Sequence, residues 1–402
     1  MTTSNVVALT QELVRTPSPS GKEDSVALLV AKRMRELGFQ VTVDCNGSVL
    51  GVIGPENTDI ALLFDGHLDV VPVTGEWRFD PFGGEIHDGR LYGRGSTDMK
   101  GGIAAAICGV AAAAREGEFK RRVAVSASVL EEVIEGHALA TILDHCQPAA
   151  VVICEPSKLH IKAGQKGRME ILLTLHGKPA HAASPECGVN PILAAARALT
   201  ALESIVLPNH RELGEALLVP TDIVSNPYPS ISMIPIATTI RFDRRTLPGE
   251  TKDHVLAAIE TCLRDAGVTD FALTVTNESV STYTGEAATP SRWLPAWQLD
   301  SDHMLLRQAV TAVEATGRVA TVGTWRFCTN GSESAGRRRI PTIGLGPGCE
   351  EDAHTIDESI AIEQLEAARD IYCRLALLAA GDETDLEIRE FVDSVAATGG
   401  NR

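Results

Sequence analysis

The sequence predicts an α/β protein whose central mixed sheet is flanked by helices and which carries an inserted α+β domain. Apolar runs of strand length alternate with amphipathic helices up to residue 166 and again after residue 285. Residues 167–284 follow the order strand-helix-strand-strand-helix-strand of a ferredoxin-like domain. A chain of 402 residues is also too long for one ordinary core. We therefore predict a discontinuous first domain, 1–166 and 285–402, and an inserted domain, 167–284.

The first domain is predicted to open with two amphipathic helices and three strands. Apolar residues recur at helical spacing in Val6–Arg15 and Glu23–Leu37. The strands are separated by turn residues and are predicted at Phe39–Val43, Val49–Ile53 and Ile60–Phe64. A long loop over residues 75–94, with a short hairpin near Asp88, comes next.

The glycine-rich segment Gly93–Gly102 precedes an alanine-rich helix, Ile103–Arg115, that we expect to be buried. The segment lacks the GxxxxGK[ST] order of a phosphate-binding loop. We interpret its glycines as allowing a tight bend that presents Asp98 at the start of the helix. Two strands of the buried type complete this half of the domain, Arg122–Leu130 and Ala149–Cys154.

The inserted domain has a clear predicted order of elements. Its strands are expected at Met169–Leu175, Leu217–Ile223, Ile231–Phe242 and Phe271–Thr276, and its helices at Asn190–Leu202 and Lys252–Ala266. The first domain then resumes with Asp302–Ala315 (helix), Arg318–Val322 and Ile340–Leu345 (strands) and Ala361–Ala379 (helix). The acidic tail from Gly381 is expected to fray.

Composition excludes several classes of partner. Lys and Arg number 36 against 53 Asp and Glu, a net charge of −17, and no basic run is interleaved with aromatic residues. Nucleic acid and anionic membranes are therefore poor partners. No apolar run approaches the roughly 20 residues of a membrane span. The nine cysteines are scattered, and no secretory signal opens the chain, which predicts a cytoplasmic protein with reduced thiols.

The apolar run Asp59–Phe64 leads directly to His67 and Asp69. Residues two apart on an extended chain point to the same side. Asp69 could therefore accept a hydrogen bond from one ring nitrogen of His67 while the other nitrogen binds a metal ion. A simple His–Asp hydrogen bond without metal is the alternative.

Acidic residues follow the other buried segments. Asp98 precedes a helix, Glu131 and Glu132 follow one strand, and Glu155 follows the next. In open α/β sheets the ligand site lies at the carboxyl ends of the strands, so these residues should converge. Several buried carboxylates in one place require a cation or protons. The alternatives are a helix-capping aspartate and solvated surface glutamates.

The collected candidates could bind two metal ions. Mixed imidazole and carboxylate ligands suit zinc, manganese or cobalt better than calcium, and they are His67, Asp98, Glu132, Glu155 and the late His354. Two divalent ions about 3.5–4 Å apart can share one carboxylate and activate a water. Glu131 could then move the proton of that water to a leaving nitrogen.

These motifs resemble those of a known family. They are His67-x-Asp69, Gly95-Ser-Thr-Asp98-Met-Lys-Gly-Gly102, Glu131-Glu132, Glu155-Pro156 and His354. In this order they resemble the dinuclear metallopeptidase family of acetylornithine deacetylases, succinyl-diaminopimelate desuccinylases, aminoacylases and glutamate carboxypeptidase, over nearly the whole chain. Passages that begin at Gly164, Trp325 and Gly344 are similar to the hydrolases linked to selenium metabolism within that family.

The resemblance implies a zinc-peptidase-like catalytic domain and an inserted domain that acts as a lid and dimerisation domain. It implies that one metal is held by His67, Asp98 and Glu155, and the other by Asp98, Glu132 and His354. Asp69 would orient His67, and Glu131 would be the general base and acid. His181 would reach the substrate oxyanion, often from the partner subunit. A histidine in a surface loop is the alternative for His181.

Two departures from the family pattern concern substrate binding. Many relatives carry an asparagine where Ser232 stands. The family segment Gly-Thr-Ser-Asp-Ala-Arg, whose arginine binds a substrate carboxylate, corresponds to Asn330–Arg337, with Gly336 at the arginine position and Arg337 one step away. Arg245 is another candidate for an anion contact, or it pairs with Asp243. The candidate substrate-binding residues are thus Ser232, Arg245, Asn330 and Arg337.

The sequence therefore predicts a metal-dependent amidohydrolase of small molecules that works as a homodimer through the lid. Its substrate would contain an N-acyl, peptide-like or related C–N bond, and its two divalent ions would be zinc by default, or manganese or cobalt. Hydrolysis of a non-peptide C–N bond, such as that of an aryl amine or a hydrazide, is the first alternative. A non-catalytic metal-binding module is the second.

Overall fold

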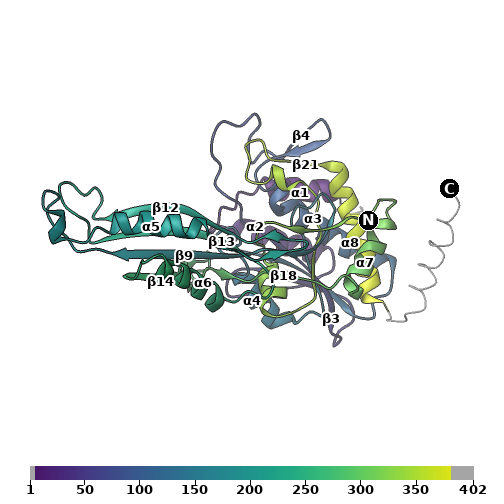
Figure 1. Cartoon of the computed structure of the whole chain (residues 1–402). Helices are drawn as coiled ribbons and strands as arrows, with labels where there is room; N and C mark the ends of the chain where they lie inside the picture. Colours follow the sequence, from purple (N-terminus) through teal and green to yellow (C-terminus); the bar gives the residue numbers. More distant parts are fainter. Residues whose placement is uncertain (1–4, 382–402) are drawn as a thin grey trace.

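A computed structural model describes residues 5–381 of the chain, which form a main domain and an elongated inserted domain that projects from it (Figure 1). The predicted fraying of the acidic tail concerns residues that lie almost entirely outside this range. No helix among the described residues is long and apolar enough to cross a membrane.

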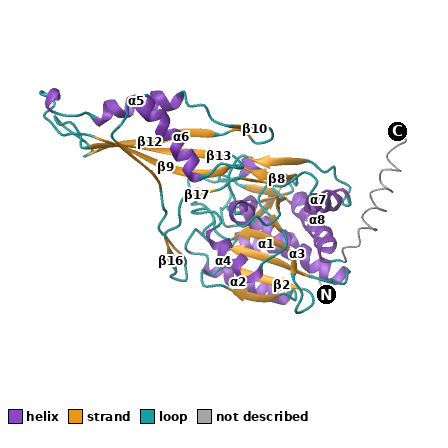
Figure 2. Ribbon diagram, turned by 60° about the horizontal axis from the view of Figure 1, so that its bottom comes forward, coloured by secondary structure: helices purple, strands orange, loops and turns teal. Residues whose placement is uncertain are grey.

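A mixed sheet of nine strands lies at the centre of the main domain as far as the chain is described, in the order β1-β2-β6-β3-β7-β20-β8-β18 with β19 beside β8 (Figure 2). β3 (Ile60–His67) is parallel to β6 (Arg122–Ser128) and to β7 (Val151–Ile153), and β7 is parallel to β20 (Thr342–Gly344). The carboxyl ends of these four strands therefore lie at one edge of the sheet. The other strands are β1 (Gln40–Val43), β2 (Val49–Ile53), β8 (Ile161–Gln165), β18 (Trp297–Gln298) and β19 (Val322–Trp325).

Helices cover both faces of this sheet, as the α/β prediction requires. On one face Leu62 and Phe64 of β3 belong to the same core as five helices: α1 (Val6–Val14), α2 (Asp24–Glu36), α3 (Gly101–Glu116), α7 (Met304–Glu314) and α8 (Ile362–Ala380). On the other face Leu63 packs in a smaller core with Leu139 of α4 (His137–Cys146). The alternation of strand residues between two apolar cores explains why residues 60–64 of β3 form an unbroken apolar run.

The inserted domain has the predicted ferredoxin-like topology. Its antiparallel sheet has the order β12-β13-β9-β14, and α5 and α6 pack on one face in a separate core. Its elements are β9 (Gly167–His176), α5 (Pro191–Glu203), β12 (Leu217–Asn226), β13 (Ala237–Thr246), α6 (Lys252–Asp265) and β14 (Phe271–Val275). The short strand β17 (Trp293–Leu294) also pairs with β9, so this sheet includes residues beyond 284.

Two neighbouring strands connect the domains. Only Lys166 separates β8 from β9, and the returning chain pairs Leu294 with Arg168 and Trp297 with Gln165. Gly167 lies at the crossing, where an added Cβ would approach Leu294 O to 2.4 Å. The junction therefore leaves no room for a larger residue.

The remaining elements are short. The strands are β4 (Glu85–His87), β5 (Arg90–Tyr92), β10 (Asn209–His210), β11 (Gly214–Glu215), β15 (Val280–Ser281), β16 (Ala287–Ala288) and β21 (Ser359–Ala361). The short helical segments are Ser96–Lys100, Pro185–Cys187, Ser332–Arg337 and Glu350–Asp352.

Several predicted boundaries were wrong. The strand predicted from Ile231 begins only at Ala237, because Pro235 lacks an N–H for the ladder. The strand predicted at Arg318–Val322 lies at Val322–Trp325. Among the elements that were not predicted are α4 and β8. The first turn of α4 has no side-chain cap, and β8 is five residues long and contains a glycine, so neither carries a strong local signal.

Candidate metal centre

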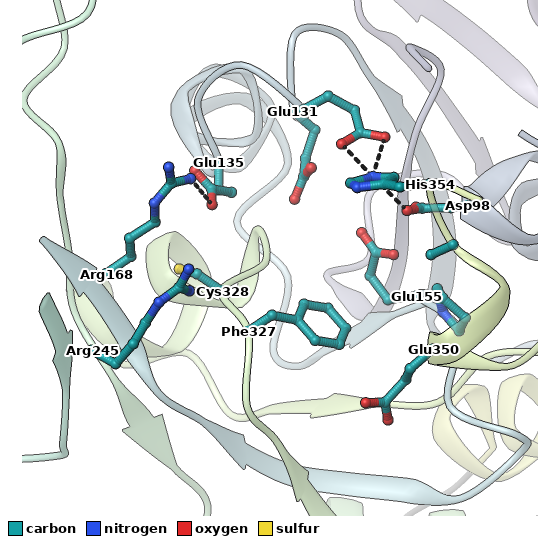
Figure 3. A pocket seen from close by; sticks show the side chains of 13 residues that line it. Asp98, Glu131, Glu135, Glu155, Arg168, Arg245, Phe327, Cys328, Glu350 and His354 are labelled. Carbon is teal, nitrogen blue, oxygen red and sulfur yellow. Dashed lines mark hydrogen bonds and ion pairs between the residues drawn. The ribbon is translucent and has the colours of Figure 1, made fainter. Parts of the chain in front are cut away.

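The parallel strands bring the predicted candidates to one edge of the sheet. His67 is the last residue of β3, Glu131 and Glu132 follow β6, and Glu155 follows β7. His354 comes from the segment after β20. Figure 3 shows Glu131, Glu155, Asp98 and His354 around one cavity. The predicted convergence at the carboxyl ends of the strands is therefore seen in the structure.

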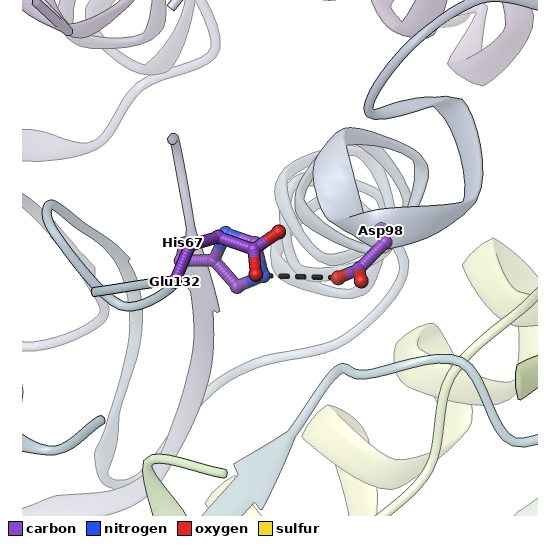
Figure 4. A group of neighbouring side chains, drawn as sticks. All are labelled: His67, Asp98 and Glu132. Carbon is purple, nitrogen blue, oxygen red and sulfur yellow. Dashed lines mark hydrogen bonds and ion pairs between the residues drawn. The ribbon is translucent and has the colours of Figure 1, made fainter. Parts of the chain in front are cut away.

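Asp98 lies between the two histidines. Its Oδ1 is 3.0 Å from His67 Nε2 (Figure 4). Its Oδ2 is 3.1 Å from His354 Nε2 (Figure 3). Glu155 Oε1 is 3.4 Å from His67 Nε2, and Glu132 Oε2 is 3.0 Å from His354 Nε2. Each histidine thus has its own glutamate, and the two share the aspartate.

The donor set fits divalent metal ions. The ligand atoms of His67, Asp98 and Glu132 all lie within 4.8 Å of one another, as do those of His67, Glu131 and Glu155. Imidazole nitrogens with carboxylate oxygens suit zinc, manganese or cobalt. Glu131 belongs to one of these sets, although its contact to His67 Nε2 is the longest, at 4.0 Å.

Burial makes the cluster electrostatically demanding. Burial, and then the nearby Asp98, raise the pKa of Glu155 to about 8. Hydrogen bonds to the carboxylates of Asp98 and Glu132 raise the pKa of His354 to about 10. Burial opposes a charge on His67, yet Glu155, Asp98 and Glu131 outweigh it and raise the pKa of His67. So many buried acids around two histidines call for positive charge, which bound cations would supply.

The Asp69 carboxylate does not make the predicted hydrogen bond to the His67 ring. The shortest contact of His67 Nδ1 is to the backbone oxygen of Asp69, at 2.9 Å, whereas the Asp69 carboxylate is 3.6 Å away. That carboxylate instead accepts hydrogen bonds from the backbone N–H groups of Glu131 and Glu132, at 3.0 and 3.1 Å, and from the Ser20 hydroxyl at 2.7 Å. Asp69 therefore holds the segment that carries the two glutamates.

Asp98 lies shortly before α3, as the sequence predicts. It lies within the short segment Ser96–Lys100 with an extended φ of −119°, and α3 begins three residues later, at Gly101. Its side chain contacts the histidines and does not cap α3. The buried Glu358 accepts hydrogen bonds from the backbone N–H groups of Thr97 and Asp98, at 2.9 and 3.0 Å. It also forms an ion pair with Arg94, at 2.6 Å. These contacts fix the backbone that presents Asp98.

A cavity of about 310 Å³ opens onto the cluster. Part of its wall comes from the inserted domain, through Arg168 and the predicted Arg245. Sequence reasoning missed five of the lining side chains, which are Glu135, Arg168, Phe327, Cys328 and Glu350. A signal for three of them existed, since Arg168 lies in the passage after Gly164, and Phe327 and Cys328 in the passage after Trp325, both of which resemble the family.

Three of the four predicted substrate-binding residues do not line this cavity, and Asn330 and Arg337 are two of them. Asn330 is buried and donates to the side chains of Asp65 and Ser128, at 2.8 and 3.1 Å. Arg337 is exposed and pairs with Glu333 at 3.1 Å. Both side chains therefore make structural contacts in this chain, and neither is among the residues that line the cavity.

His181 and Ser232 lie together but outside the cavity. Both are exposed, and Ser232 O accepts a hydrogen bond from Ala182 N at 3.0 Å. β9 begins beside the cavity and ends at His176, and ten residues of strand span roughly 33 Å. The loop with His181 follows this far end, so the structure does not bring His181 to the metal cluster of its own chain.

Comparison with known proteins decides the family. The sequence model of peptidase family M20/M25/M40 matches residues 63–378. The chain belongs to the M20/M25/M40 peptidase family. This confirms the family inferred from the motifs, and the chain is accordingly a metallohydrolase that acts on C–N bonds.

Relatives within the M20 family match nearly the full chain. YgeY of Escherichia coli (strain K12), an uncharacterised protein, is 30% identical over 376 residues, which are 91% of this chain and 92% of YgeY. Succinyl-diaminopimelate desuccinylase 2 of Ruegeria sp. (strain TM1040) is 27% identical over 391 residues, 92% of this chain and 93% of that enzyme. The crystal structure of aminopeptidase PepT from Bacillus cereus ATCC 10987 has a TM-score of 0.73 at 20% identity and covers 95% of this chain and 100% of PepT, which shows the fold.

Proposed function

We propose that this protein hydrolyses an amide bond in a small molecule, of the N-acyl amino acid, peptide-like or related C–N type, with two divalent metal ions. The observation that carries the proposal is the position of Asp98, whose two oxygens each face one histidine. His67, Asp98 and Glu155 would hold one ion, and Asp98, Glu132 and His354 the other. Ions bound in this way lower the pKa of a water and polarise a carbonyl. Zinc is the proposed metal because this donor set suits it.

Glu131 is the proposed general base and acid. It lines the cavity and is largely buried, and burial raises its pKa. A carboxylate with a raised pKa is a better proton acceptor at neutral pH. Asp69 fixes its backbone through the hydrogen bond at 3.0 Å. Glu131 would take a proton from the attacking water and return it to the leaving nitrogen.

The test is turnover by the Glu131→Gln variant together with its metal content. The wild type would first be loaded with Zn, Mn or Co and given a panel of N-acyl amino acids and dipeptides. We expect the variant to retain close to two metal equivalents. Its turnover of any substrate that the wild type cleaves should fall at least 100-fold, because general acid–base catalysis contributes about 100- to 10,000-fold. Glu351→Gln is the matched control, since Glu351 is exposed, does not line the cavity and pairs with Lys158 at 3.1 Å. Unchanged turnover in Glu131→Gln contradicts the assigned base.

Hydrolysis of a non-peptide C–N bond is the second candidate function. Asn330 and Arg337 do not line the cavity. In the family resemblance, Arg337 lies beside the position of the arginine that binds a substrate carboxylate, so its place outside the cavity favours a substrate without that carboxylate. The same activated water could attack an aryl amine or hydrazide substrate. Product identification by mass spectrometry separates the two candidates.

We further propose a homodimer formed through the inserted domain. β12 is an edge strand of its sheet with apolar residues exposed along it, Leu217, Val219, Ile223 and Val224. A long apolar edge strand is a site for pairing with another chain. Two copies of β12 paired antiparallel would give a closed, twofold interface. Because His181 is remote from its own cluster, such a dimer would let it serve the partner's cavity. The cytoplasmic location stays a prediction from the sequence.

A further inference from the structure

The inserted domain places two arginines in the cavity wall, away from the metal cluster. Arg168 on β9 and Arg245 on β13 both line the cavity, and the strand register sets them directly opposite each other. Side chains in this relation share a face of the sheet, with Cβ atoms about 4.5–5.5 Å apart, and like charges there are destabilising. The pair therefore costs stability unless negative charge compensates for it.

Neighbouring carboxylates satisfy only part of this pair. Arg245 donates to the carboxylate of Asp243 at 2.7 and 3.1 Å, and Arg168 Nη1 donates to Glu135 at 3.2 Å. Nε of Arg168 is buried without a hydrogen-bond partner in the described chain, and Asp243 lies 3.6 Å from it. Each guanidinium has five N–H donors. At least one buried donor of the pair, Arg168 Nε, thus has no hydrogen-bond acceptor among the described residues.

Other cations lie close to the pair. Burial, and then Arg326, Arg245 and Arg244, lower the pKa of Lys166, which lies at the junction between the domains. This concentration of positive charge occurs in a protein whose net charge is −17. A cleft lined with charge of one sign attracts ligand groups of the opposite sign.

The cavity has an apolar part between its two charged ends. Figure 3 shows Arg168 and Arg245 on one side, Asp98, Glu155 and His354 on the other, and the ring of Phe327 between them. Pro156 and Ala353 also line it. A ligand that spans the cavity therefore meets cations, then apolar surface, and then the metal-binding residues.

We propose that Arg168 and Arg245 form an anion-binding subsite and that the substrate carries an anionic group, in the simplest case a carboxylate, joined to the scissile C–N bond by an apolar segment. This inference rests on the proposed hydrolase function and names the substrate class of the same cavity. Planar guanidinium groups bind carboxylates through two parallel hydrogen bonds.

The test compares pairs of ligands that differ only in charge. N-acyl amino acids and their carboxamides would be titrated into the Zn-loaded protein by calorimetry, and turnover of the same pairs would be measured by amine release. We expect the wild type to bind the carboxylates at least tenfold more tightly than the carboxamides. In Arg245→Gln and Arg168→Gln this ratio should fall close to one, while carboxamide binding is unchanged. Arg245→Lys should give an intermediate ratio, because it keeps the charge without the planar fork.

Arg241→Gln is the matched control variant. Arg241 lies on β13 on the same face of the sheet, pairs with Glu170 and does not line the cavity. Its ratio should equal that of the wild type. Equal binding of carboxylates and carboxamides by the wild type, binding of neither, or a ratio that survives both glutamine substitutions overturns the inference. Selective binding without turnover of any ligand would support the subsite and count against the proposed function alone, so the two fail separately.

Discussion

Asp98 depends on a residue 260 positions later in the chain. Glu358 accepts the N–H groups of Thr97 and Asp98 and is itself held by Arg94. Since His354 lies only four residues before Glu358, one short segment both supplies a histidine and fixes the aspartate that faces it. Glu358 is therefore a positioning residue for the shared carboxylate.

Glu358→Gln should weaken metal binding. The substitution removes the ion pair with Arg94 and loosens the backbone at Asp98, and changes in such outer partners typically cost about 10- to 100-fold in metal affinity. Zinc affinity would be measured by competition with a chelator. Glu250→Gln is the control, because Glu250 also pairs with a buried arginine, Arg244, and accepts a backbone N–H, from Leu247, but lies in the inserted domain. Equal zinc affinity in both variants would refute the positioning role.

The metal-free protein should lose stability as pH rises. The pKa of Glu155 is raised to about 8 and that of His354 to about 10, so the folded state binds protons more strongly than the unfolded state. For groups with raised pKa, stability is complete below the unfolded value and declines up to the folded value. The melting temperature of chelator-treated protein should therefore fall from pH 5 to pH 9, and zinc should restore it. A melting temperature that rises over this range would contradict the shifts.

At the scale of elements, close approach of α3 and α8 sets the main core. α3 is rich in alanine and glycine, and a Cβ added at Gly109 would lie 2.6 Å from Arg369 O of α8. Small residues on α3 thus bring the two backbones together. The sequence indicated a buried helix here but not its partner, because the helical pattern of α3 does not specify which element covers it.

Gly109→Val should destabilise the main domain. Insertion of extra atoms into a packed contact costs about 1–3 kcal/mol, which would lower the thermal midpoint by several degrees. Differential scanning calorimetry would measure it. Gly323→Val on β19 is the control, since an added Cβ there meets no atom within 4 Å. If both variants melt alike, α3 and α8 do not pack as closely as described.

At the scale of the whole molecule, the features that could be predicted from the sequence are those set by hydrophobic periodicity and by the order of the strands. Runs such as Ile60–Phe64 identified the buried strands, and their parallel order explains why His67 and Glu155 meet. Contacts across domains were beyond such reasoning. Arg168 meets Glu135 because the junction between the domains places the start of β9 beside the cavity, and no local pattern records that contact.

Pairing through β12 should be sensitive to charge. Ile223→Lys places a lysine on the exposed edge, where lysine opposes edge-to-edge pairing. We expect sedimentation velocity to show a dimer for the wild type and a monomer for this variant. Val319→Lys in the main domain is the control, because Val319 is also exposed and apolar. A dimer that survives Ile223→Lys excludes this interface.

The tight crossing at Gly167 would act as a short hinge for the inserted domain. Two paired strands form the joint, and β9 extends from it as an arm of roughly 33 Å. A rotation of about 10° at the joint, too small to change its strand pairing, would displace the far end by roughly 6 Å over an arm of that length. Arg168 and Arg245 lie near this hinge, whereas the loop with His181 follows the far end of β9. One rotation would therefore barely move the two arginines and would strongly move the His181 loop. The inserted domain could then move His181 toward a neighbouring chain without displacing the two arginines that would bind the anion.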